Sequence, residues 1–95
     1  MGEILYKDES FQILGACFEV YNHKGFGFTE PVYQECLLHE FRLREIPFVA
    51  QPEVPLTYKG IELTQHFRPD FICYEKIIVE IKSVACFADA HEPRP

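Results

Sequence analysis

The sequence contains no tryptophan, only one methionine, and no Cys-x-x-Cys pair among its four cysteines. The lack of paired cysteines and of regular Cys–His spacing excludes the common structural zinc sites. No apolar run approaches the roughly 20 residues of a membrane-spanning helix. The first residues also lack the basic start and long apolar core of a signal peptide. We therefore expect a cytoplasmic protein without membrane association.

Basic residues are scarce: nine Lys and Arg stand against fifteen Asp and Glu, which gives a formal net charge of −6. Phosphate-binding proteins normally present a basic face. The acidic balance therefore argues against tight non-specific binding of DNA by an isolated monomer. Local cations could still contact a phosphate backbone, and the candidates are Arg42, Arg44, Arg68 and Lys82.

The length of 95 residues is enough for one small folded domain spanning residues 1–95. The chain is 47% hydrophobic and 15% aromatic, which is typical of a globular protein rather than a disordered one. Cys17, Cys36 and Cys73 each fall inside an apolar pattern, so we expect reduced thiols in the core. The four histidines are scattered and are predicted to be surface or packing residues.

Two helices are predicted in the first half of the chain. The first begins at a cap on Asp8 or Ser10 and runs to about Tyr21. It is expected to be well buried, with one apolar stripe widened by a second (Phe11, Leu14, Phe18 and Tyr21; Ile13, Cys17 and Val20). Gly25 or Gly27 can then adopt positive φ.

The second helix is predicted to begin after an N-cap at Thr29 and to run to about Arg44. Its expected apolar face consists of Val32, Tyr33, Cys36, Leu37, Phe41 and Leu43. Glu30 lies in its first turn, where the helix dipole favours an acid, and about half of such residues need no further role.

The second half reads as β structure, so the order of elements predicts an α+β fold. Residues 48–58 contain two prolines and are expected to form an edge or irregular strand. Lys59-Gly60 is a predicted turn into a return strand. A further hairpin is expected around residues 74–76, and residues 83–90 are expected to form a short helical turn.

Residues 67–82 read as two apolar strands that carry three charged side chains. Nine residues separate Asp70 from Glu80, and the period of two places Glu80 and Lys82 on one face. Charges in an interior strand cost several kcal/mol per ion unless each finds a partner. Two carboxylates and a lysine at one place suit a hard divalent cation and an activated water. The alternative is an Asp at a strand entrance and a surface Glu/Lys pair.

The loop between these strands decides whether the carboxylates meet. A three-residue loop at Tyr74, Glu75 and Lys76 places Asp70 opposite Glu80 on one face. A two-residue turn would pair Asp70 with Ile81 and send the carboxylates to opposite faces. We therefore predict an odd-length loop or a bulge.

Three blocks of sequence carry a family resemblance. They are the Gly-x-x-Glu-x-x-Tyr segment 27–33, the Phe-Arg-Pro-Asp segment 67–70, and Glu80-Ile81-Lys82. With the opening helix and the Tyr58-Lys59-Gly60 turn, the chain resembles the GxxExxY family of PD-(D/E)xK nuclease-like proteins over nearly its whole length. The resemblance implies a restriction-endonuclease-like core of two N-terminal helices and a mixed sheet of about four strands.

The resemblance also implies a site and a reaction. Asp70, Glu80 and the Ile81 carbonyl would hold Mg²⁺ or Mn²⁺, and Glu30 would complete or orient the site. Lys82 would orient or help to deprotonate the attacking water, or stabilise charge on the phosphate. The reaction would be hydrolysis of nucleic acid, DNA in the first instance, with Arg68 contacting the substrate. Tyr33 would pack or donate a hydrogen bond rather than react.

One departure from the family pattern affects this expectation. In relatives that look complete, the Glu-x-Lys strand leads through a His-Glu step into a long helix bearing a Gln and a Tyr. Here His91-Glu92 is followed only by residues 93–95, so the final helix is expected to be missing. An uncovered sheet face would favour a homodimer. Two alternative functions therefore stay open: a catalytically silent nuclease-fold scaffold, or an unrelated ligand-binding domain.

Overall fold

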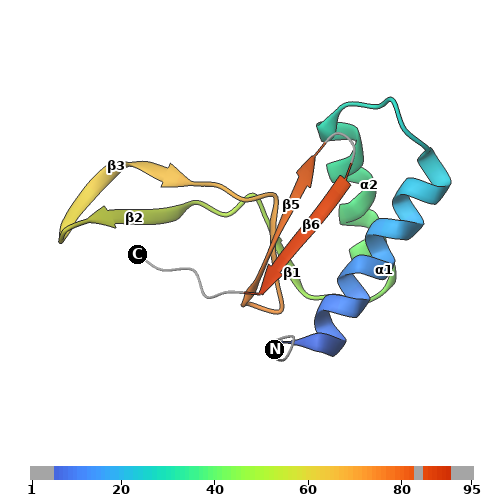
Figure 1. The fold of residues 1–95 in the computed structure, drawn as a ribbon, viewed down its shortest axis with the longest axis horizontal. Helices are drawn as coiled ribbons and strands as arrows, with labels where there is room; N and C mark the ends of the chain where they lie inside the picture. The colour runs from blue at the N-terminus through green and yellow to red at the C-terminus, as the bar shows by residue number, and fades with distance from the viewer. Residues whose placement is uncertain (1–5, 83–84, 91–95) are drawn as a thin grey trace, which may run out of the picture.

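The computed structural model of the chain describes residues 6–82 and the backbone path of residues 85–90. Two helices precede all the strands, which confirms the predicted α+β class (Figure 1). The elements are α1 (Lys7–Lys24), α2 (Glu30–Leu43), β1 (Phe48–Ala50), β2 (Val54–Tyr58), β3 (Ile61–Phe67), β4 (Phe71–Cys73), β5 (Ile77–Lys82) and β6 (Ala85–Ala90). No helix in the described ranges is both long and apolar enough to cross a membrane. Residues 91–95, on which the expectation of a missing final helix rests, lie outside the described residues.

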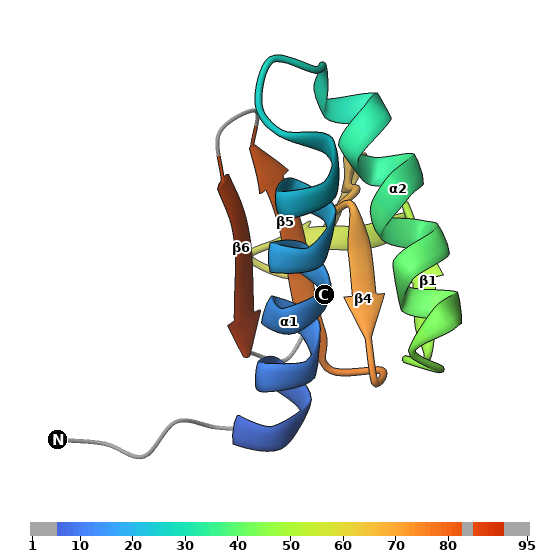
Figure 2. The same cartoon turned by 90° about the vertical axis from the view of Figure 1, so that its right-hand side faces the viewer.

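The strands form a four-stranded sheet in the order β1-β4-β5-β6 and a separate two-stranded ribbon of β2 and β3. The family resemblance implies a mixed sheet of about four strands, and the strand pairs in the described ranges are antiparallel. Both helices cover one face of the sheet, and the ribbon projects from the opposite side (Figures 1 and 2). The ribbon is inserted between β1 and β4, so these two strands pair across it.

Two predictions about the strands need correction. The single irregular strand expected over residues 48–58 is divided at Gln51, which has φ 49°, and Pro52 follows, whose nitrogen cannot donate to a ladder. The helical turn expected after Lys82 is wrong, because residues 85–90 pair with β5 from Lys82↔Ala85 to Ile77↔Ala90. Without that strand, one edge of β5 would have unpaired backbone groups.

Helix α1 packs through only one of the two apolar stripes that were expected to be buried. Ile13, Ala16, Cys17 and Val20 are its buried residues. The spacing i, i+3, i+4, i+7 forms a single face, and that face meets α2 and the sheet. The other stripe lies outside: Phe11 is 74% exposed, Phe18 68% and Leu14 38%. The prediction that both stripes would be buried is therefore wrong.

The ends of the helices are partly as predicted. Helix α1 begins at Lys7 after Tyr6, which has φ 54°, so neither Asp8 nor Ser10 is the cap. Gly25 and Gly27 both have positive φ, as expected. Helix α2 has Thr29 as its N-cap, also as expected, and it ends at Leu43.

The core joins α2 to the sheet through aromatic rings. Tyr33, Leu37 and Phe41 are the buried residues of α2, whereas Leu43, expected on the same face, is 78% exposed. The Phe41 ring lies 5.0 Å from that of Phe71 and 5.7 Å from that of Phe48. Such edge-to-face and tilted contacts stabilise a core beyond the area that they bury.

The cysteines also depart from prediction at one position. Cys36 and Cys73 are free thiols, as expected. Burial raises the pKa of the Cys73 thiol to about 12, so it stays protonated at neutral pH. Cys17 is disulfide-bonded, and the expectation that it is a reduced thiol is wrong.

Candidate active site

The hairpin between β4 and β5 has the register that the site requires. Cys73 pairs with Ile77, so the loop consists of Tyr74, Glu75 and Lys76. Tyr74 and Glu75 have φ of 55° and 63°, the left-handed conformation that closes this turn. Phe71 pairs with Val79, and the next step of the same register places Asp70 opposite Glu80. The predicted three-residue loop is therefore confirmed.

Strand β5 divides its side chains between the core and the site. Ile77, Val79 and Ile81 belong to the hydrophobic core beneath the helices. The alternating residues point to the opposite face, where Glu80 is partly exposed and Lys82 is exposed. One strand thus anchors itself in the core and presents a carboxylate and an ammonium on its other face.

Asp70 is held between two strands at the point where β4 begins. Its Oδ2 accepts a hydrogen bond of 2.7 Å from the backbone N–H of Ile81. Its own carbonyl oxygen accepts a bond of 2.9 Å from the N–H of Gln51 beside β1. Pro69, which precedes it, is fully buried and restricts the backbone. The Asp70 carboxylate is therefore fixed against the Glu80–Lys82 segment.

The pKa of Glu80 responds to the charges of Asp70, Lys82 and Glu30. Its pKa is raised first by partial burial and then by the negative charge of Asp70. The Lys82 ammonium lowers it, and the Glu30 carboxylate raises it slightly. Like charges held close together disfavour ionisation, and a bound cation removes that penalty.

Glu30 comes from a different element than the other members of this group. It is the exposed first residue of α2, and it acts on Glu80 only as the weakest of the four effects. In the part of the chain that the structure describes, no three His, Cys, Asp or Glu side chains lie close enough together to hold a metal ion. The fold thus brings Asp70 and Glu80 together and leaves Glu30 as a charge nearby.

Two of the predicted basic contacts, Arg68 and Arg44, lie outside this group. Arg68 is exposed and forms an ion pair with Glu53 beside the ribbon, where His66 lies 3.7 Å from the same carboxylate. Arg44 pairs with Glu40 at 2.7 Å, at the end of α2 remote from Glu30. Of the four cations considered from the sequence, Lys82 is the one that acts on Glu80.

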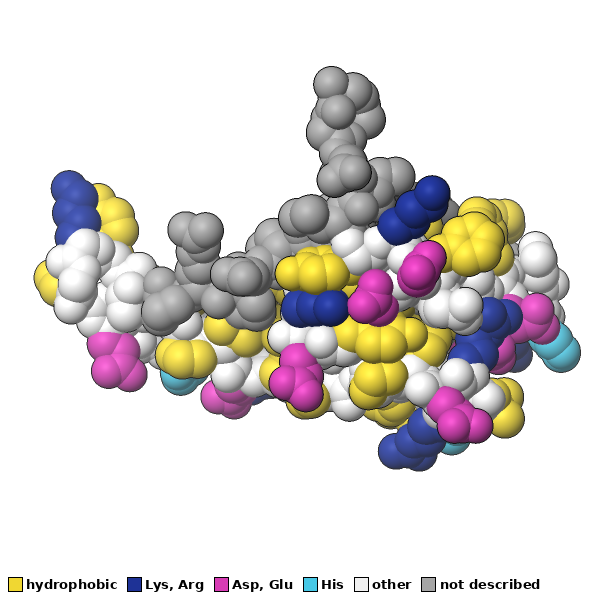
Figure 3. Space-filling view, turned by 90° about the horizontal axis from the view of Figure 1, so that it is seen from below, with side chains coloured by type: hydrophobic (Ala, Val, Ile, Leu, Met, Phe, Trp, Pro, Cys, Tyr) yellow, Lys and Arg dark blue, Asp and Glu magenta, His cyan; other side chains and the backbone are white. Residues whose placement is uncertain are grey.

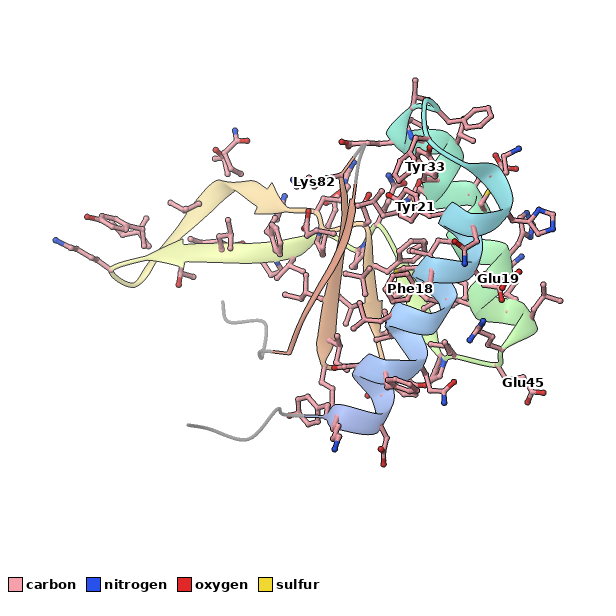
Figure 4. The ribbon with its side chains drawn as sticks, turned by 45° about the vertical axis from the view of Figure 1, so that its right-hand side comes forward. Phe18, Glu19, Tyr21, Tyr33, Glu45 and Lys82 are labelled. Carbon is pink, nitrogen blue, oxygen red and sulfur yellow. The ribbon has the colours of Figure 1, made fainter. Side chains whose placement is uncertain are left out.

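Sequence reasoning missed Tyr21 as a residue of this region. Its hydroxyl donates a hydrogen bond of 3.0 Å to the carbonyl oxygen of Lys82, and its ring lies 4.7 Å from that of Tyr33 (Figure 4). Burial, followed by the charges of Tyr33 and Glu30, raises the pKa of Tyr21. The sequence did contain a signal for this contact. Tyr21 is the one residue with a polar group in the stripe that begins at Phe11, and a phenol hydroxyl next to the core needs a hydrogen-bond partner.

Tyr33, the tyrosine of the Gly-x-x-Glu-x-x-Tyr segment, orders the loop that leads to Glu30. It is 1% exposed. Its hydroxyl donates to the Gly25 carbonyl at 2.6 Å and accepts from the Phe28 N–H at 3.3 Å. The expectation that it packs or donates a hydrogen bond is confirmed.

The family model of the PD-(D/E)XK nuclease superfamily matches residues 7–94. No curated protein and no solved structure is significantly similar to the chain. Members of the superfamily generally use divalent metals and act on nucleic acid. The matched range includes the helices and strands of the described residues and the Asp70–Lys82 hairpin, and the chain belongs to the PD-(D/E)XK nuclease superfamily.

Proposed function

We propose that the protein is a metal-dependent nuclease of the GxxExxY group that hydrolyses phosphodiester bonds in nucleic acid, with DNA as the first substrate to test. The observation that carries the proposal is the position of Asp70 opposite Glu80, with the pKa of Glu80 raised by the charge of Asp70. Strand pairs that serve only stability avoid placing like charges directly opposite each other.

The donor atoms suit a hard cation. Asp70 and Glu80 offer carboxylate oxygens, and the Ile81 carbonyl lies on the same strand. Oxygen ligands are preferred by Mg²⁺ and Mn²⁺, and Mg²⁺ commonly binds through only one or two carboxylates. Two carboxylates are therefore enough, and the longer-range position of Glu30 suits a role in completing or orienting the site.

Each residue of the site has its own role in hydrolysis. A divalent cation at the carboxylates would polarise a phosphate oxygen and favour deprotonation of a nearby water. Lys82, on the face of Glu80, orients that water or neutralises charge that develops on the phosphate. Asp70 keeps its orientation through the Ile81 N–H. Arg68 leaves its ion pair with Glu53 and contacts a phosphate of the substrate backbone.

The direct test is cleavage of plasmid and of single-stranded DNA in Mg²⁺ or Mn²⁺ by the wild type, Asp70→Ala and Glu80→Ala. Both variants are expected to lose cleavage while circular dichroism shows an intact fold. Glu75→Ala, in the exposed loop of the same hairpin, is the control that removes a carboxylate outside the site. Undiminished cleavage in both site variants would contradict the proposal.

A second candidate function is a silent nuclease-fold module that acts as a homodimer. It is favoured by the exposed stripe of Phe11, Leu14 and Phe18 and by the exposed apolar side chains of β3, which a monomer leaves in water. Light scattering after size-exclusion chromatography tests the dimer. Calorimetric titration with Mn²⁺ separates the two functions, because a scaffold has no need of a cation site.

A further inference from the structure

The loop between the helices, residues 25–29, carries two exposed aromatic side chains at the edge of the candidate active site. Phe26 is 73% exposed and Phe28 is 42% exposed. The loop and the C-terminal end of β5 lie at the same end of the molecule (Figures 1 and 2). Two large apolar rings in water next to a charged site need an explanation, because burying them would stabilise the fold.

The loop is held in place by contacts with site residues. Tyr33 hydrogen-bonds to both Gly25 and Phe28, which fixes the loop backbone at two points. The Phe26 ring lies 6.0 Å from the ring of Tyr21, whose hydroxyl binds the Lys82 carbonyl. Phe26 is thus connected through one side chain to the end of the strand that carries Glu80. The hydrogen bonds of the loop backbone therefore hold Phe26 in its exposed position.

A cation accompanies the aromatic rings. The Lys24 ammonium lies 4.7 Å from the centroid of the Phe28 ring, at the end of α1 where the loop begins. The ring faces attract cations, and a lysine held there also attracts a phosphate. Proteins that bind single-stranded nucleic acid combine aromatic side chains, on which bases stack, with cations that contact the backbone, and this loop offers both kinds of group.

The overall charge favours an unpaired strand over a duplex. Binding to duplex DNA draws much of its affinity from phosphate neutralisation, and this chain has a net charge of −6. Figure 3 shows the side of the molecule away from this loop, and there acidic and basic side chains are intermingled rather than gathered into a basic face. Base stacking adds affinity without further basic residues, and it requires a base whose face is not covered by its neighbours in a duplex.

We propose that residues 24–28 form a stacking site for unpaired bases, so that the substrate of the nuclease is single-stranded nucleic acid. Phe26 stacks on a base, and Lys24 contacts the adjoining phosphate. This inference rests on the proposed function for its position beside a hydrolytic centre, but the binding that it predicts can be measured without hydrolysis.

The test is fluorescence anisotropy with a labelled oligothymidine of about 12 nucleotides and a duplex of the same length, in Ca²⁺. The wild type is expected to bind the single strand at least tenfold more tightly than the duplex. Phe26→Ala should weaken single-strand binding about tenfold or more. Phe11→Ala, at an equally exposed site on the first half of α1, should leave it unchanged. Lys24→Gln should weaken binding and reduce its salt dependence, whereas Lys59→Gln, a lysine beside Tyr58 at the tip of the ribbon, should not.

The outcomes separate the two proposals. Equal binding of duplex and single strand, or unchanged binding in Phe26→Ala, would overturn the stacking site whether or not the protein cleaves DNA. Tight single-strand binding that depends on Phe26, in a protein that shows no cleavage in Mn²⁺, would support the stacking site and remove the nuclease proposal.

Discussion

The hydroxyl of Tyr21 donates a hydrogen bond of 3.0 Å to the carbonyl oxygen of Lys82, and this bond joins the last turns of α1 to the end of β5. The two residues are 61 positions apart in the sequence. The bond fixes the strand end that bears Glu80 and Lys82 at the end of the molecule where α2 begins with Glu30. It is a contact through which the helical layer can set the geometry of the candidate active site.

Replacement of Tyr21 by Phe should therefore affect activity more than stability. The ring contact with Tyr33 remains, and only a partly exposed hydrogen bond is lost, at a cost of about 0.5–1.5 kcal/mol. We expect kcat to fall several-fold at a temperature where the variant is still folded, with KM little changed and the melting temperature lowered by several degrees. Unchanged kcat in the folded variant would show that Tyr21 has only a structural role.

Removal of the Asp70 charge should abolish cation binding. In a calorimetric titration with Mn²⁺, the wild type is expected to bind and Asp70→Asn to show no binding, because one of two ligating carboxylates is lost. Glu53→Gln, which removes a carboxylate that pairs with Arg68, is the matched control and should bind as the wild type does. Identical titrations of wild type and Asp70→Asn would exclude Asp70 as a ligand.

The raised pKa of Glu80 predicts a pH dependence of stability. A raised pKa in the folded state means that the fold binds this proton more tightly than the unfolded chain, whose value is near 4.5. Ionisation of Glu80 therefore opposes folding as pH rises from about 4.5 through the raised value. Glu80→Gln should raise the melting temperature slightly at pH 7, on the order of 1–2 °C, and not at pH 4. A stabilisation that is equal at both values would show that charge repulsion is not its cause.

The hydroxyl of Tyr33 should be important for stability as well as for the loop. It is buried, and Tyr33→Phe leaves the Gly25 carbonyl and the Phe28 N–H without this partner, at a cost of about 1–3 kcal/mol. Chemical denaturation measures this loss. Tyr58→Phe, at the exposed tip of the ribbon, should change the free energy of unfolding by less than about 0.5 kcal/mol.

Replacement of a core and of a surface phenylalanine should show how much each ring contributes to stability, and whether the exposed stripe of the first helix is covered in solution. Phe71→Ala removes a fully buried ring that packs on Phe41 and should cost about 3–5 kcal/mol. Phe18→Ala removes a ring that is 68% exposed and should cost less than about 1 kcal/mol in a monomer. A large loss for Phe18→Ala, dependent on protein concentration, would show that a second copy covers this stripe.

The sequence by itself determined the parts of this protein that depend on local rules. The period of two in β5 and a three-residue loop fix which face Glu80 takes and which residue lies opposite it, so the meeting of Asp70 and Glu80 was predictable. The N-cap at Thr29 and the glycine φ values also follow from local preferences. Each of these features is set by residues close together in the chain.

The tertiary structure decided what depends on partners far away in the sequence. Helix α1 has two apolar stripes that its sequence makes nearly equivalent, and only the position of α2 and the sheet selects the one from Ile13 to Val20. The strand at residues 85–90 forms because β5 offers it an edge, and its alanine-rich sequence gives no strong strand signal of its own. Likewise, Tyr21 becomes part of the candidate site only because the fold brings the Lys82 carbonyl to its hydroxyl. Long-range packing, which has no local sequence signature, supplied all three.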